Sequence, residues 1–197
     1  MINKKIKLKT IQKEFLLNSL FKSKNFYGES INKIKKKNFN FIYGIRHNFS
    51  IINLKTTIFY LQKSLFLIKY YLKKKKNILI IGNSFDIKFL LNKKQFINNN
   101  PNILLYNKKW INGLLTNKTI SNFFKKKQIK LVIILKSHNK EHYLFTEFNH
   151  KKIPIIALIN TNSNINNINY PIFSNTKNLK SLFFLIYLIK KIFNNKQ

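Results

Sequence analysis

The sequence predicts an α/β protein in which parallel strands alternate with helices along the chain. Two observations predict this class. Short apolar runs recur along the chain, and segments with the helical spacing of apolar residues separate them. The runs are apolar throughout, as expected of strands that are covered on both faces of a parallel sheet. Because 45% of the 197 residues are hydrophobic, the chain can also bury a core.

Residues 1–53 are predicted to form a basic N-terminal domain. Residues 10–23 have the spacing of a short amphipathic helix, and residues 24–50 are irregular and basic. Aromatic and β-branched residues within that basic stretch indicate an extended segment or a hairpin. They are Phe41, Tyr43, Phe49 and Ile51.

Residues 54–197 are predicted to form the α/β core, which opens with the clearest helix of the chain. Its apolar residues recur at spacings of three and four, which places them on one face. They are Leu54, Ile58, Leu61, Leu65, Ile68 and Leu72. Asn53 can cap the N-terminus of this helix, and the lysines at 73–76 suit its C-terminal dipole.

The remaining core elements follow from the same two patterns. Strands are expected at residues 77–81, 103–106, 130–135, 155–159 and 170–173, and helices at 84–97, 139–149 and 177–193. The longest apolar run, residues 182–189, is shorter than the roughly 18 residues that a membrane span needs. We therefore expect no membrane insertion.

The charge balance points to a polyanionic partner. Lys and Arg number 38 against 5 Asp and Glu, which gives a net charge of +33. A globular protein with that charge repels itself unless an anion neutralises it. Lysine runs are spread over the whole chain, whereas a DNA-binding arm or a membrane patch would concentrate them in one segment. The distribution favours a protein in contact with RNA on several sides.

A second bias concerns codon usage. Lys, Asn, Ile and Phe dominate, while the chain has one Ala and one Arg. The favoured residues have A/T-rich codons, which indicates the A+T-rich genome of an organelle or a reduced symbiont. The start of the chain shows no secretory signal, and the absence of cysteine excludes disulfides and thiolate metal sites.

Catalytic and cofactor motifs are missing, so we expect no enzyme, no cofactor and no small-molecule substrate. Gly82 follows a predicted strand, but no glycine-rich phosphate loop surrounds it. The five carboxylates form no obvious acid–base pair, and neither Ser84 nor Ser137 has an evident base. His138, His142 and His150 lie close in sequence, but no cysteine or matching carboxylate makes them a metal site.

The connector after the predicted strand at 103–106 combines lysines, amides and the only tryptophan. Lysine can neutralise phosphate, and a tryptophan ring can stack on a base. A packed turn with Trp110 in the core explains the same residues equally well. The physics of the segment leaves both alternatives open.

Three ordered motifs resemble the ribosomal small-subunit protein S-two family of bacteria and organelles. The first is a Trp-x-x-Gly-x-Leu-Thr-Asn signature at residues 110–117. The second covers residues 153–162 and 170–175, and the third covers residues 42–46 and 51–54. Together the motifs span about residues 15–190. The chain departs from the family pattern at Asn53, Lys109, Asn160, Phe173 and Ser174.

The resemblance implies a flavodoxin-like, doubly wound parallel sheet with helices on both faces and no cofactor. It implies a structural protein of the small ribosomal subunit that binds rRNA between head and body beside neighbouring ribosomal proteins. We expect a mitochondrial location, with a plastid as the alternative. The competing function is a basic α/β protein that binds nucleic acid or a membrane surface outside the ribosome.

The resemblance also implies a difference from bacterial members, which carry a long helical hairpin before the strand at 130–135. Residues 118–129 are too few for two helices of several turns, so we expect a direct crossover. Basic runs and motif residues together give the expected RNA-binding residues. They are Lys35, Lys36, Lys37, Arg46, His47, Lys108, Lys109, Trp110, Asn117, Lys118, Lys125, Lys126 and Lys127.

Overall fold

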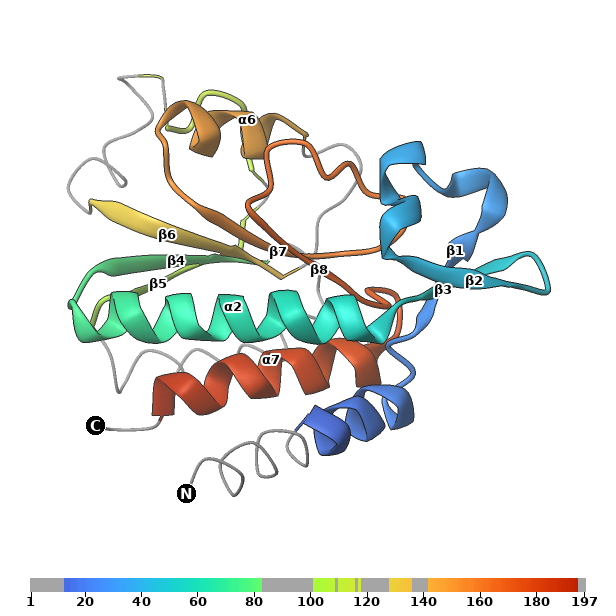
Figure 1. The fold of residues 1–197 in the computed structure, drawn as a ribbon. Coiled ribbons are helices and arrows are strands. Elements are labelled where there is room, and N and C mark those ends of the chain that lie inside the picture. The colour runs from blue at the N-terminus through green and yellow to red at the C-terminus, as the bar shows by residue number, and fades with distance from the viewer. Residues whose placement is uncertain are drawn as a thin grey trace.

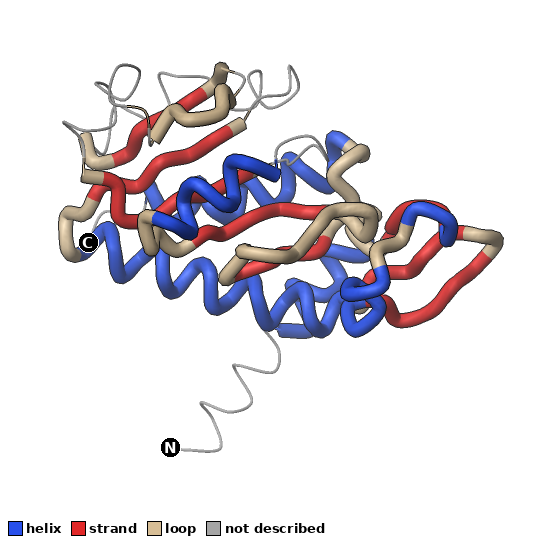
Figure 2. Tube along the Cα trace, turned by 90° about the horizontal axis from the view of Figure 1, so that it is seen from above, coloured by secondary structure: helices blue, strands red, loops and turns tan. Residues whose placement is uncertain are grey.

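A computed structural model describes residues 13–82, 101–108, 110–115, 117, 128–135 and 142–194. Two sheets organise this part of the chain (Figure 1). A five-stranded sheet forms the core, and a three-stranded sheet lies at one end of it, as the view from above also shows (Figure 2). The predicted α/β class is confirmed.

The large sheet is parallel throughout and has the order β5-β4-β6-β7-β8. Numbered along the chain, this is the order 2-1-3-4-5 of flavodoxin-like folds. Its strands are β4 (Asn77–Ile81), β5 (Ile103–Tyr106), β6 (Ile129–Ile134), β7 (Ile155–Ile159) and β8 (Tyr170–Phe173). All five predicted strands are present, and β6 begins one residue earlier than expected.

Alternating side chains of the large sheet supply two separate cores, because successive residues of a strand point to opposite faces. In β4, Ile78 and Ile80 face one core while Leu79 and Ile81 face the other. The first core is covered by α2 (Leu54–Lys73) and α7 (Leu179–Asn194), and the second by α6 (His142–His150). Helices therefore lie on both faces, as Figure 1 shows.

The helices agree with the sequence patterns wherever they are described. Asn53 caps α2, and its side-chain oxygen accepts a hydrogen bond from the backbone N–H of Lys55 at 3.0 Å. A helix over residues 13–22 matches the expected N-terminal one. The predicted helix at 84–97 and the segment 118–127 lie outside the described residues. No described helix is both long and apolar enough to cross a membrane.

The small sheet is antiparallel, in the order β1-β3-β2. Strands β2 (Ile42–Arg46) and β3 (Phe49–Ile52) form the expected hairpin. His47 and Asn48 turn it with φ of 46° and 61°, the left-handed pair that a two-residue hairpin loop requires. The sequence did not reveal β1 (Tyr27–Ser30), nor the 3₁₀ turns η1 (Ile31–Lys33) and η2 (Lys36–Phe41).

Candidate nucleic-acid interface

Thr161, in the loop that follows β7, holds the small sheet against the core. Its side-chain hydroxyl oxygen accepts a hydrogen bond from the backbone N–H of Glu29 at 2.9 Å and lies 3.1 Å from the Ser50 hydroxyl. Ser50 in turn lies 2.8 Å from the Glu29 carbonyl oxygen, to which it donates. All three residues are buried. The strand β1 therefore docks on the loop after β7 through a closed polar network.

Gly28 allows this close approach. A Cβ atom at this position would lie 2.2 Å from the Ser50 hydroxyl oxygen and 2.9 Å from the methyl carbon of Thr161. Real Cβ atoms essentially never come that near to another heavy atom. A side chain at residue 28 would push the small sheet away from the core.

The same loop anchors the lysine-rich turn η2. The Asn38 side-chain amide donates to the carbonyl oxygens of Thr161 at 2.7 Å and Ser163 at 2.8 Å. The backbone N–H of Lys35 donates to the Thr161 carbonyl oxygen at 3.3 Å. Because Asn38 is fully buried, the turn is fixed from inside while its lysines point outward. The lysines are therefore presented on a fixed backbone, which suits a surface that binds phosphate groups.

The expected RNA-binding residues other than Trp110 fall into three groups. Five of them are exposed and belong to the N-terminal part. Lys35, Lys36 and Lys37 lie at the start of η2, and Arg46 and His47 lie at the tip of the β2–β3 hairpin. Lys108 and Asn117 are exposed on the connector after β5. The others lie outside the described residues: Lys109, Lys118, Lys125, Lys126 and Lys127.

Trp110 takes the packed alternative that the sequence left open. Its side chain is only 7% exposed and belongs to the core beneath α6. The indole lies edge-on to Tyr106 at 5.5 Å and tilted against Phe148 at 5.2 Å, measured between ring centroids. A ring enclosed in this way cannot stack on an RNA base while the fold is intact.

The connector around Trp110 is held by a carboxylate that sequence reasoning missed. Glu147 in α6 accepts hydrogen bonds from the backbone N–H groups of Gly113 at 2.7 Å and Leu115 at 3.1 Å. Gly113 has a φ of 83°, which glycine adopts without strain. The Trp-x-x-Gly-x-Leu signature thus builds a turn. Glu147 lies 32 to 34 residues away in sequence, and no local pattern could have paired it with this turn.

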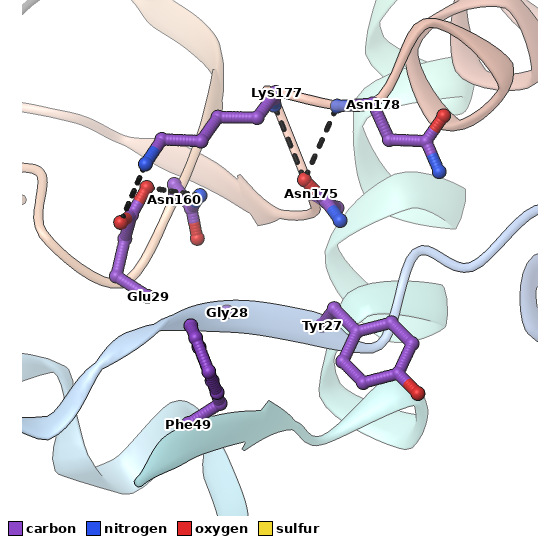
Figure 3. Close-up of a pocket in the computed structure, with 8 residues that line it drawn as sticks. All are labelled: Tyr27, Gly28, Glu29, Phe49, Asn160, Asn175, Lys177 and Asn178. Atoms are coloured by element: carbon purple, nitrogen blue, oxygen red, sulfur yellow. Dashed lines mark hydrogen bonds and ion pairs between the residues drawn. The ribbon is translucent and has the colours of Figure 1, made fainter.

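A shallow pocket of about 460 Å³ opens between β1 and the loop that precedes α7 (Figure 3). Buried Glu29 forms an ion pair there with Lys177, with 2.8 Å between the carboxylate oxygen and the ammonium nitrogen. The Asn160 side-chain amide donates to the other Glu29 oxygen at 3.2 Å. Among the described residues this is the one ion pair found, and none of them form a cluster suited to a metal ion.

Among the described residues, the surface carries many cations and one exposed carboxylate. Glu29 and Glu147 are buried and engaged, and only Glu14 is exposed. The lysines of η2 and the arginine of the β2–β3 turn therefore have no described carboxylate beside them apart from the enclosed Glu29. Such a surface can neutralise the phosphates of a nucleic acid.

Comparison with known proteins agrees with these features. The family model for Ribosomal protein S2, the S-two family, matches residues 20–131 and 120–195. Small ribosomal subunit protein uS2m of Acanthamoeba castellanii is 28% identical over 179 residues, covering 89% of this chain and 56% of that protein. Small ribosomal subunit protein uS2 of Ehrlichia ruminantium (strain Gardel) is 24% identical over 223 aligned positions, covering 89% of this chain and 75% of its own length.

The match extends over most of the chain and both of its sheets. It includes Trp110, the Asn160–Thr161 loop and the β2–β3 hairpin, which are the three regions that carried the resemblance. Proteins of this family are structural components of the ribosome and not enzymes. From its family match, its sheet order and its motifs, the chain belongs to the ribosomal protein S2 family.

Proposed function

We propose that this chain is a structural protein of the small ribosomal subunit and binds its rRNA through the end of the molecule that carries the small sheet. The observation that carries the proposal is that Lys35, Lys36 and Lys37 on η2 and Arg46 and His47 on the β2–β3 hairpin are all exposed on a protein of the S2 family. A net charge of +33 needs a polyanion, and rRNA is the polyanion of the ribosome. Neighbouring small-subunit proteins complete the expected surroundings.

The N-terminal segment 1–53 serves in this proposal as the RNA-facing domain, and residues 54–197 serve as the supporting core. The proposed boundary falls between β3, which ends at Ile52, and α2, which begins at Leu54. Lys108 and Asn117 lie on a different connector, after β5, and would contact a second stretch of rRNA. Dispersed charge of this kind suits a protein that RNA touches on more than one side.

A mitochondrial location is the second part of the proposal. The Acanthamoeba castellanii relative carries the name uS2m, and the A+T-driven composition fits an organellar genome. Bacterial uS2 proteins of Ehrlichia and Bartonella are also similar, so the location rests on the composition as much as on the relatives. A plastid is the alternative compartment.

We also propose that the helical hairpin of bacterial relatives is absent here. The alignment with the Ehrlichia ruminantium protein spans 223 positions, more than the 197 residues of this chain, so the relative has residues without a counterpart. The two family-model matches meet at residues 120–131, directly before and within β6. Only residues 118–128 separate Asn117 from β6 in the sequence, and β6 pairs in parallel with β4.

Salt dependence of RNA binding tests the proposal. For the full chain with a small-subunit rRNA fragment, log affinity should fall with log salt concentration with a slope on the order of −4 or steeper. Replacing Lys35, Lys36 and Lys37 together by Gln should flatten the slope by roughly 2 to 3, at about 0.7 to 0.9 per lost phosphate contact. The matched control replaces Lys63, Lys69 and Lys73 of α2 by Gln. These lysines are exposed, and their replacement removes the same amount of charge.

The two variants separate the general from the local claim. A slope near zero for the unaltered chain would overturn RNA binding. Equal flattening by the two triple variants would leave RNA binding intact and overturn the assignment of the contact to η2.

A further inference from the structure

The pocket in Figure 3 is lined by aromatic rings and asparagines in addition to the Glu29–Lys177 ion pair. Its floor is β1 at Gly28, and its roof is the loop before α7. Tyr27 and Phe49 flank it with side chains that are 46% and 52% exposed. Its volume of about 460 Å³ lies within the range of roughly 300–1,000 Å³ that small-molecule sites occupy.

The Tyr27 ring is braced from one side. It lies 4.3 Å from the ring of Phe26, which stacks on Phe21 at 4.7 Å with an interplanar angle of 11°. These two phenylalanine rings hold Tyr27 in place while nearly half of it stays open to solvent. A ring that is already fixed loses little conformational entropy when a flat ligand stacks on it.

The charges of the pocket cancel each other, although the chain as a whole carries +33. Lys177 neutralises Glu29 at 2.8 Å, and the other polar side chains of the lining, three asparagines and Tyr27, are uncharged. An anion gains little from such a pocket, because the carboxylate offsets the attraction of the ammonium group. A neutral ligand with polar edges suits it better than a phosphate does.

The unused polar groups of the pocket are hydrogen-bond donors. The Asn175 side-chain oxygen accepts from the backbone N–H groups of Lys177 and Asn178, each at 3.2 Å. The Asn178 side-chain oxygen accepts from the backbone N–H of Lys180 at 3.0 Å. These contacts orient both amides, and their nitrogens have no acceptor among the described residues. They can donate to the carbonyl oxygens and ring nitrogens of a nucleobase.

A cationic side chain lies beside the aromatic side of the pocket. Arg46 is directly opposite Phe49 in the β2–β3 register, so the two side chains share one face of the small sheet. The guanidinium group is exposed and can reach a phosphate next to a base that lies on Phe49. The neutral pocket and its charged edge therefore match the two parts of one nucleotide.

We propose that this pocket binds one unstacked base of single-stranded rRNA, with Tyr27 and Phe49 as stacking surfaces and Asn175 and Asn178 as donors to the base edge. The inference rests on the proposed function and names the form of RNA recognised at this end of the molecule. Bases within an A-form duplex are stacked and paired, so their faces cannot reach these rings. The pocket thus selects loops, bulges or strand ends.

The test compares single-stranded RNA with a duplex of the same length, both of mixed sequence, as ligands of the full chain. Tyr27→Leu and Phe49→Leu keep apolar bulk but remove the π face. Each should weaken single-strand binding by roughly 5- to 150-fold, the range of base–aromatic stacking. Duplex affinity and the salt slope should stay unchanged, because no cation is lost. Phe49→Tyr should bind as the unaltered chain does, which also shows that the site tolerates substitution.

Phe66→Leu on α2 is the control, since this ring is 75% exposed and belongs to another surface. Unchanged single-strand affinity in both pocket variants would overturn the proposal, and so would an equal loss for duplex RNA or for Phe66→Leu. These outcomes leave salt-dependent RNA binding of the unaltered chain in place. Failure of the proposed function looks different, because the unaltered chain would then bind neither RNA.

Discussion

The junction between the two sheets allows the sharpest stability prediction, the substitution Gly28→Ala. The added Cβ would meet the Ser50 hydroxyl oxygen at 2.2 Å, whereas ordinary contact begins at 3.4 Å. Both Ser50 and Thr161 are buried, so neither can swing into solvent. The strand β1 must retreat by about 1 Å from the loop after β7, an estimate that assumes close-packed surroundings.

That retreat has a calculable effect on the free energy of unfolding. Overpacking a buried site costs about 1–3 kcal/mol. The hydrogen bonds of Thr161 to Glu29 and Ser50 would lengthen, and each contributes about 1 kcal/mol. We expect a loss of about 2–4 kcal/mol, which for a domain of this size lowers the Tm by roughly 5–15 °C.

Urea denaturation of the full chain, followed by far-ultraviolet circular dichroism, measures the effect. Gly44→Ala in β2 is the matched control, because its Cβ would meet nothing within 4 Å. It should change the free energy of unfolding by less than about 0.5 kcal/mol. Gly28→Ala combined with Ser50→Ala removes the nearest clashing atom, so the pair should cost less than the sum of the single changes. Equal effects at Gly28 and Gly44, or strict additivity with Ser50→Ala, would refute the reasoning.

Three further predictions concern the core beneath α6. Glu147→Gln should cost about 1.5–3 kcal/mol in a urea titration, because an amide can accept from only one of the two N–H groups at Gly113 and Leu115. Trp110 should show the fluorescence of a buried indole, and saturating RNA should leave its emission unchanged; strong quenching by RNA would contradict its packed position. Burial raises the pKa of Tyr106 above its usual 10.0, so the native state holds a proton that the unfolded state has lost. Stability should therefore fall as the pH rises above about 10, and Tyr106→Phe should reduce that fall.

Strand positions were predictable because a strand that is buried on both faces needs consecutive apolar residues, and such a run is visible in the sequence. Alternate side chains of residues Ile78–Ile81 pack into the two cores on opposite faces of the sheet, and so do those of Val132 to Ile134. The periodicity of α2 and its Asn53 cap were equally local signals, and the structure confirms both. What was predictable is thus what a few neighbouring residues determine together.

Contacts between distant residues were not predictable in this way. Strand β1 has no alternating apolar pattern that would reveal it in the sequence. Gly28 is needed because Thr161 comes close to its backbone, and Glu29 is needed because it pairs with Lys177. These partners lie more than 130 residues away in sequence. Trp110 illustrates the same limit. The composition of its connector suited either RNA binding or a packed turn, and the contact between Trp110 and Phe148 in the structure distinguishes the two.

Sedimentation of the chain with ribosomal particles tests the central claim most directly. A tagged copy expressed in its own cells, or in mitochondria of a related host, would be followed through a gradient after gentle lysis. We predict that it co-migrates with the small subunit at low salt and leaves the particle only at high salt, as phosphate contacts demand. Migration as free protein, with membranes, or with particles that lack small-subunit rRNA at low salt would contradict the account.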